Sequence, residues 1–120
     1  MKPPTHPLIA DLNAIDPVPC PCGEARRALL AADNTLCSLH RVTVSADARR
    51  HYHRAHTEVY YILEGHGWIE LDGVLTPIGP GSAVLIPPGV RHRAVRGERG
   101  AMTLLNLVMP PFDAGDEVED

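Results

Sequence analysis

Glycine and proline divide the second half of this chain into apolar segments that are too short for most helices. The segments cover residues 58–63, 68–71, 74–78, 83–86, 90–95 and 102–108. Asp72-Gly73 separates two of them and is a strong hairpin signal, because a type I′ turn needs positive φ at both central residues. Gly79-Pro80-Gly81 and Pro87-Pro88-Gly89 interrupt the chain again. Short strands at this spacing predict an all-β sandwich or barrel.

The 120 residues suffice for one domain, which we divide into three parts. Residues 1–23 contain six prolines and form an N-terminal arm, and its apolar side chains predict docking of residues 8–19. Residues 24–112 form the body. Residues 36–45 alternate as a half-buried strand does, whereas residues 24–32 have helix-forming composition. The acidic residues 113–120 are expected to be a mobile tail.

Composition argues against several classes of protein. No apolar run approaches the roughly 20 residues of a membrane helix, and the N-terminus lacks the apolar core of a signal peptide. The three cysteines are an odd number, which favours reduced thiols and a cytoplasmic location. Cys20-Pro-Cys22 is only a weak zinc signal, and an extended chain discourages a disulfide between near neighbours. We expect these cysteines to be incidental.

The charge of the chain does not suggest nucleic-acid binding. The net charge is −4, but residues 113–120 hold five of the 15 acidic residues, which leaves 10 acids against 11 bases elsewhere. Ten of the 11 bases are arginines, and arginine pairs well with carboxylate or phosphate. The arginines that flank the histidines therefore either attract an anion or form a solvated surface.

The histidines around residue 51 indicate a metal site. His51 and His53 are two residues apart, so both imidazoles project from one face of a strand. Together with Glu58 they offer the ligands of a divalent first-row metal. His56 could replace His53 but breaks this alternation, and we interpret it as a residue at a pocket rim or on the surface. Tyr60 shares the face of Glu58 and is either a pocket residue or part of the core.

Two stretches of the chain resemble the paired motifs of the cupin superfamily. Residues 51–65 fit H-x-H-x4-E-x6-G, and residues 81–92 fit G-x5-P-x-G-x2-H. Ser45 and Arg96 stand where the family pattern has glycine and asparagine. The resemblance implies a jelly-roll fold, with residues 24–32 as an edge strand beside residues 36–44. It also implies that one divalent Fe, Mn, Zn or Ni ion binds to His51, His53, Glu58 and His92.

The resemblance leaves the activity open. Cupins with these motifs include dioxygenases, sugar isomerases, decarboxylases and lyases, while others only bind a sugar or a small acid. We expect a metalloenzyme acting on a small, oxygen-rich anion, with a non-catalytic binding protein as the alternative. Arg96, Tyr60 and His56 are the candidate substrate-binding residues, and Tyr60 and Arg96 are also catalytic candidates. Glu70 is a further possible acid or base.

The other face of the strand at residues 58–63 suggests self-association. Val59, Tyr61 and Leu63 alternate with Glu58 and predict an apolar outer surface. A small barrel would leave this surface uncovered, so we expect a homodimer. Trp68 lies on the face opposite Ile69, and the sequence does not show which of the two faces inward.

Overall fold

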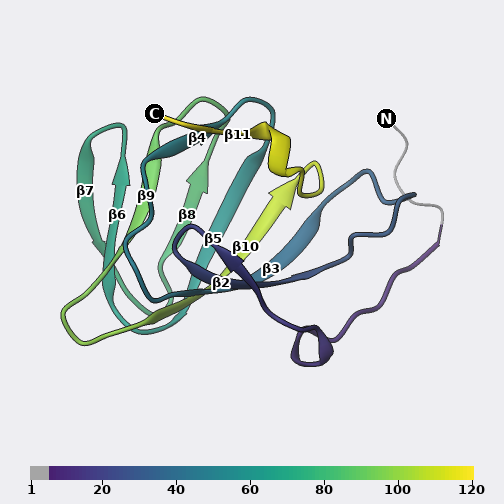
Figure 1. Cartoon of the computed structure of the whole chain (residues 1–120), viewed down its shortest axis with the longest axis horizontal. Coiled ribbons are helices and arrows are strands. Elements are labelled where there is room, and N and C mark those ends of the chain that lie inside the picture. Colours follow the sequence, from purple (N-terminus) through teal and green to yellow (C-terminus); the bar gives the residue numbers. More distant parts are fainter. Residues whose placement is uncertain (1–5) are drawn as a thin grey trace.

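Two antiparallel sheets pack face to face in the computed structural model, which describes residues 6–120 (Figure 1). The first sheet has the order β1 (Val18–Cys20), β2 (Gly23–Ala28), β3 (Ser38–Val44), β10 (Met102–Met109), β5 (Thr57–Glu64) and β8 (Ala83–Ile86). The second has the order β11 (Glu117–Glu119), β4 (His51–His53), β9 (His92–Arg96), β6 (Gly67–Leu71) and β7 (Val74–Ile78). Residues 12–14 and 114–116 form short 3-10 helices. The predicted jelly roll is confirmed.

Strand alternation places an apolar core and a polar cluster at different positions along the same strands. Ile62 on β5, Ile69 on β6 and Leu104 on β10 are almost fully buried. Two to four residues further along, the inward positions become polar, as at Glu58 on β5 and Asn106 on β10. The apolar part excludes water and stabilises the sandwich, at about 1.5–3 kcal/mol for each large side chain. The inward polar residues are therefore not needed for the apolar core and can form a functional site.

The first part of the segment with helix-forming composition, up to Ala28, is a strand. β2 pairs with β3 in antiparallel register, with Arg27 opposite His40, because pairing inside a sheet overrides a weak helical preference. It is not an edge strand as expected, since β1 pairs with its other side. The arm docks there: the Arg26 guanidinium donates to the carbonyls of Asn13 and Ile15 at 3.2 and 3.0 Å. Ile9, by contrast, is fully exposed, and residues 1–5 lie outside the described part.

The acidic C-terminal segment is ordered, which corrects the expectation of a mobile tail. Figure 1 shows β11 beside β4, and Glu117 pairs with His53 in the antiparallel ladder. The Asp116 carboxylate accepts hydrogen bonds from the amides of Ala55 and His56. The physical reason is that β4 offers an unpaired edge and nearby arginines offer counter-charges, among them Arg91 3.2 Å from Asp120.

The outer faces of both sheets carry apolar side chains. Trp68 is exposed on the outer face of the second sheet, while its neighbour Ile69 faces the core. On the first sheet, Tyr61 and Leu85 are 46% and 63% exposed. Among residues 6–120, the structure has no helix long and apolar enough to cross a membrane.

Candidate metal centre

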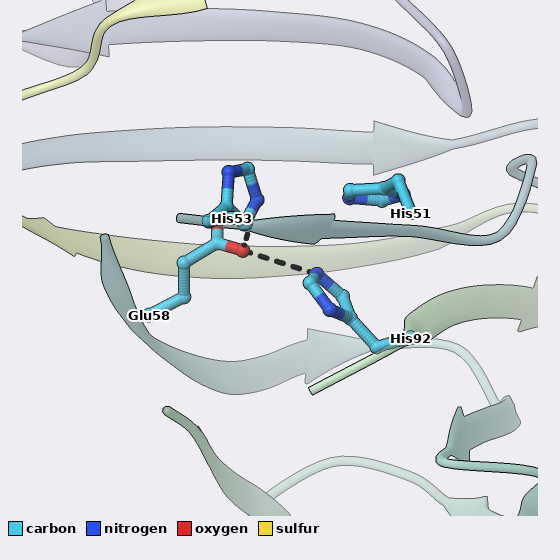
Figure 2. A group of neighbouring side chains, drawn as sticks. All are labelled: His51, His53, Glu58 and His92. Atoms are coloured by element: carbon cyan, nitrogen blue, oxygen red, sulfur yellow. Dashed lines mark hydrogen bonds and ion pairs between the residues drawn. The ribbon is translucent and has the colours of Figure 1, made fainter. Parts of the chain in front are cut away.

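Three strands bring together the four residues proposed as metal ligands (Figure 2). One ligand atom from each of His51, His53, Glu58 and His92 lies within 4.8 Å of every other. The Nε2 atoms of His53 and His92 are 2.9 and 3.1 Å from the same Glu58 oxygen, Oε1. His92 is fully buried and Glu58 nearly so.

Sheet register explains this convergence. His51 on β4 lies directly opposite His92 on β9, and strand alternation turns His53 to the same side as His51. Glu58 reaches the cluster from the first sheet, because its inward parity on β5 matches that of Tyr60 and Ile62. The two sheets thus contribute three imidazoles and one carboxylate to one point.

Backbone carbonyls fix the orientation of two imidazoles. The Nδ1 atoms of His51 and His92 lie 2.9 Å from the carbonyl oxygens of Arg49 and Val90. A carbonyl only accepts, so Nδ1 carries the proton in both rings and donates it. In the neutral rings, Nε2 then directs a lone pair toward the cluster. This is how metal-binding histidines are usually oriented by their second nitrogen.

The electrostatics of the cluster suit a cation. Burial alone would raise the pKa of Glu58, but the bond from His53, the contact with His92 and the hydrogen bond from Asn106 outweigh it and hold that pKa far below its usual range. Burial lowers the pKa of His51, and the nearby His92 lowers it further. For His53, burial acts downward, but the bond to Glu58 prevails and raises the pKa. A carboxylate facing imidazole lone pairs needs either protons or a metal ion, and three nitrogens with one oxygen fit Fe, Mn, Zn or Ni.

Comparison with known proteins identifies the family. The family model of the cupin domain matches residues 38–108. The chain belongs to the cupin family. L-ectoine synthase of Aliivibrio fischeri is 33% identical over 99 residues, which cover 81% of this cupin and 77% of that protein. An uncharacterized protein of Methanocaldococcus jannaschii is 31% identical over 75 residues, and the match spans 62% of this cupin and only 60% of the archaeal protein.

Solved structures share the whole fold. A protein from Planctomyces limnophilus superposes with a TM-score of 0.85 and is 43% identical, with 94% of this cupin and 96% of that chain covered. Ectoine synthase from P. lautus has a TM-score of 0.74 at 23% identity, covering 94% of this cupin and 89% of its own chain. The second likeness shows the fold alone.

Three residues of the His3Glu cluster of this cupin, namely His51, His53 and Glu58, line a cavity of about 90 Å³ between the two sheets. Tyr60 lines it, and burial together with the Glu58 charge raises the pKa of its hydroxyl well above the usual value. The hydroxyl therefore stays protonated at neutral pH and can donate a hydrogen bond. Other lining residues come from both ends of the chain, namely Cys20, Pro21, Cys22, Arg27, Phe112 and Glu117.

Arg96 does not line this cavity, contrary to the expectation from the sequence. Its parity on β9 matches that of His92, but it lies four residues further along, roughly 13 Å at about 3.3 Å per residue. Its side chain is exposed. Glu70 is also outside the site, because it bonds to Arg93 at 3.3 Å on the outer face of the second sheet.

His56 is a buried part of the cavity wall rather than a rim or surface residue. Its Nδ1 lies 2.9 Å from an Asp116 oxygen and its Nε2 lies 3.1 Å from the Pro111 carbonyl oxygen. With both nitrogens engaged, His56 is less suited than His53 to bind a metal. The same Asp116 oxygen lies 4.0 Å from Nδ1 of His53, an atom without a hydrogen-bond partner among the described residues.

Arg27 is a cavity residue that the sequence pattern did not indicate. It lies on β2 opposite His40, and its guanidinium carbon is 4.0 Å from the centre of the Phe112 ring. Its Nε is buried without a hydrogen-bond partner, and no ion pair of Arg27 is found within residues 6–120. Arg27 shares its strand face with the buried Ala25, and this inward position can be predicted only once residues 23–28 are known to form a strand.

Proposed function

We propose that this cupin is a mononuclear metalloenzyme that acts on a small, oxygen-rich, anionic metabolite. One observation carries the proposal: a single cavity is lined by three residues of the His3Glu cluster, namely His51, His53 and Glu58, and by Arg27, whose guanidinium has no ion pair within residues 6–120. A single buried water needs a cavity of roughly 10–15 Å³ by this measure, so a cavity of about 90 Å³ has room for a small molecule.

The proposed ligands are His51, His53, Glu58 and His92, holding one divalent Fe, Mn, Zn or Ni ion. Such an ion would supply Lewis-acid or redox chemistry to a bound oxygen group. The protein contributes the orientation. The carbonyls of Arg49 and Val90 hold two of the rings in place, and the core keeps bulk water from one side.

Arg27 takes the role that the sequence had suggested for Arg96. Its planar fork matches a carboxylate, and contact with Phe112 on one face holds the guanidinium in position. A partly buried guanidinium without a counter-ion is costly, so an anionic ligand is its natural partner. Tyr60 adds a protonated hydroxyl that can donate to a developing negative charge on the substrate.

The named relatives support an enzyme acting on a small molecule. L-ectoine synthase is named for making a small molecule, and this cupin shares about a third of its residues with that enzyme over the matched region. The class of reaction, whether dioxygenase, isomerase or lyase, depends on which metal is bound. Elemental analysis of the purified protein distinguishes these cases: iron favours oxygen chemistry, and zinc, manganese or nickel favours the others.

Calorimetry with small acids tests the proposal. The protein is loaded with manganese and titrated with 2-keto and 2-hydroxy acids, as wild type, Arg27→Met and Arg96→Ala. Loss of a buried charge-assisted pair should weaken binding by about 10–100-fold in Arg27→Met. Arg96→Ala should bind as wild type does. Equal affinity in Arg27→Met, or binding of neutral sugars in place of acids, would contradict the anionic substrate.

Turnover separates the enzyme from the non-catalytic alternative. Any acid that binds is incubated with protein loaded with each of the four metals, and the mixture is followed by NMR. Conversion that disappears in His53→Ala supports an enzyme. An acid that binds tightly but is recovered unchanged with every metal would make the protein a binding cupin.

We also propose that the outer face of the first sheet forms a homodimer interface. Tyr61 and Leu85 are exposed there, and the ladder places Leu85 opposite Val59. Sedimentation at micromolar concentration should give a dimer, and Tyr61→Glu should give a monomer. Val74→Lys, at an exposed position on the other sheet, is the control. A monomeric wild type would refute the interface.

A further inference from the structure

Cys20 precedes a tight turn, Cys22 lies within it, and the two side chains meet at the cavity wall. Cys20 ends β1, Gly23 begins β2, and Pro21 and Cys22 form the turn between them. The two Sγ atoms are 3.5 Å apart, and both residues line the cavity. The chain is therefore not extended here, and the expectation that these cysteines are incidental does not describe their geometry.

The backbone of the turn is held in place by hydrogen bonds to the segment that follows β3. The Cys22 carbonyl accepts hydrogen bonds from the amides of Ser45 and Ala46 at 2.9 and 3.0 Å. Gly23 has a φ of +151°, and a Cβ there would lie 2.1 Å from the Thr43 carbonyl oxygen. The turn thus needs glycine at this position, and its fixed backbone keeps the two sulfurs close together.

The two thiols differ in acidity. The contact with the Cys22 thiol, joined by the nearby Arg27 charge, lowers the pKa of Cys20 to about 6 despite its partial burial. The same contact raises the pKa of Cys22. At neutral pH, Cys20 is thus the better nucleophile, and Cys22 is the protonated neighbour.

We propose that Cys20 and Cys22 form a peroxide-reactive redox pair in the cavity wall. The Cys20 sulfur attacks hydrogen peroxide, an S–O bond forms, the O–O bond breaks and hydroxide leaves, giving a sulfenic acid. The Cys22 sulfur then attacks the Cys20 sulfur, an S–S bond forms, the S–O bond breaks and water leaves. The two sulfurs lose two electrons in total, and the peroxide accepts them.

The geometry makes the second step short. A disulfide bond is about 2.05 Å long, so the sulfurs must approach by about 1.5 Å from their present 3.5 Å. The Cys20 sulfur lies in the field of Arg27, so oxidation replaces a thiolate near Arg27 by a neutral disulfide. The pair thus provides a redox response in the wall of the cavity, and this inference does not depend on the identity of the substrate.

Peptide mapping after mild oxidation tests the pair, and Cys37 is an internal control because all three cysteines are partly exposed. Trypsin leaves Cys20 and Cys22 together in residues 1–26, whereas Cys37 falls in residues 28–41. The native protein is treated with one equivalent of hydrogen peroxide, alkylated and digested. The first peptide should lose about 2 Da and escape alkylation, while Cys37 stays alkylatable.

Single variants then separate the two roles. In Cys22→Ser, the Cys20 sulfenic acid should persist and be trapped by dimedone, because the second thiol is missing. In Cys20→Ser, Cys22 should react with peroxide more than about tenfold more slowly than Cys20 does in the native protein, because burial also raises the pKa of Cys22. Oxidation that is equal at all three cysteines, or a disulfide that joins Cys37 or two chains instead, would overturn the proposal.

Discussion

The two walls of the cavity originate differently. One wall is formed by β4, β5 and β9, which bring together in space the histidines and glutamate of the two family motifs. The other is formed by the two ends of the chain: the hairpin of β1 and β2, and residues 111–117. We call these the motif wall and the terminal wall. The motif wall offers the proposed metal ligands, whereas the terminal wall offers a guanidinium, a thiol pair and the Glu117 carboxylate.

This difference suggests a division of labour. The residue types of the motif wall are those that the cupin pattern requires. They indicate that a metal can bind, but they do not indicate which substrate binds. The terminal wall lies outside the matched region at residues 38–108. Its residues, such as Arg27 and Phe112, do not belong to the family pattern. We therefore expect variants in the motif wall to abolish metal binding, and variants in the terminal wall to change what is bound or how tightly.

The largest expected effect comes from removing one ligand of the motif wall. His53→Ala should weaken binding of manganese or zinc by more than about 100-fold. Loss of a residue that only orients a ligand typically weakens metal binding by about 10–100-fold, and loss of a ligand itself should cost more. The β-sheet circular dichroism should be unchanged. His6→Ala, an exposed histidine on the arm, is the control. Full metal occupancy in His53→Ala, measured by elemental analysis after dialysis, would disprove the assignment.

The next effect concerns His40, which faces the terminal wall. Burial, with a contribution from the Arg27 charge, lowers the pKa of His40 to about 4. The unfolded chain therefore binds a proton near pH 6.5 that the folded protein does not, and stability falls as the pH drops from about 6.5 to 4. Between pH 7 and pH 5 this amounts to about 2 kcal/mol of unfolding free energy.

Urea unfolding of the metal-free protein at both pH values measures this contribution. His40→Gln keeps a polar group for Ser38, which lies 2.8 Å from Nε2, but cannot titrate. The variant should lose about 2 kcal/mol less than wild type between pH 7 and pH 5. An identical pH dependence in both proteins would show that His40 is not held neutral by its surroundings.

The contrast between the walls also explains what could be predicted from the sequence. Alternation groups His51 with His53, and the resemblance to the cupin motifs adds Glu58 and His92 to the predicted ligands; the structure brings the four side chains together. Arg96 shows the limit of such patterns. Residue parity predicts which face of a strand a side chain occupies, but it does not predict how far along the strand the side chain lies from the site. The positions of Arg27 and the Cys20-Pro-Cys22 turn depend on how the first strands pair. That pairing could not be predicted from local propensity alone, because residues 24–32 have helix-forming composition. Likewise, β11 was not predicted, because the acidic composition of residues 113–120 is typical of a mobile tail.

The smallest predicted effect tests whether the terminal wall also tunes the motif wall. Asp116 is the link, because one of its oxygens is 2.9 Å from Nδ1 of His56 and 4.0 Å from Nδ1 of His53. Burial would raise the pKa of Asp116, but the His56 and Ala55 amides lower it, so the carboxylate is charged at neutral pH. A negative charge behind an imidazole makes the ring a better metal ligand.

Asp116→Asn keeps an oxygen for the two amides but removes the charge. Metal affinity, measured by competition with a chelator, should therefore fall by about tenfold, which is about 1.4 kcal/mol, while the thermal midpoint of the metal-free protein changes little. Asp113→Asn is the matched control, because the Asp113 side chain hydrogen-bonds within its own turn, to the amide of Gly115. If Asp116→Asn binds the metal with wild-type affinity, only residues of the motif wall determine the metal affinity. A tenfold loss would show that the C-terminal segment acts on the metal site through the far side of His53.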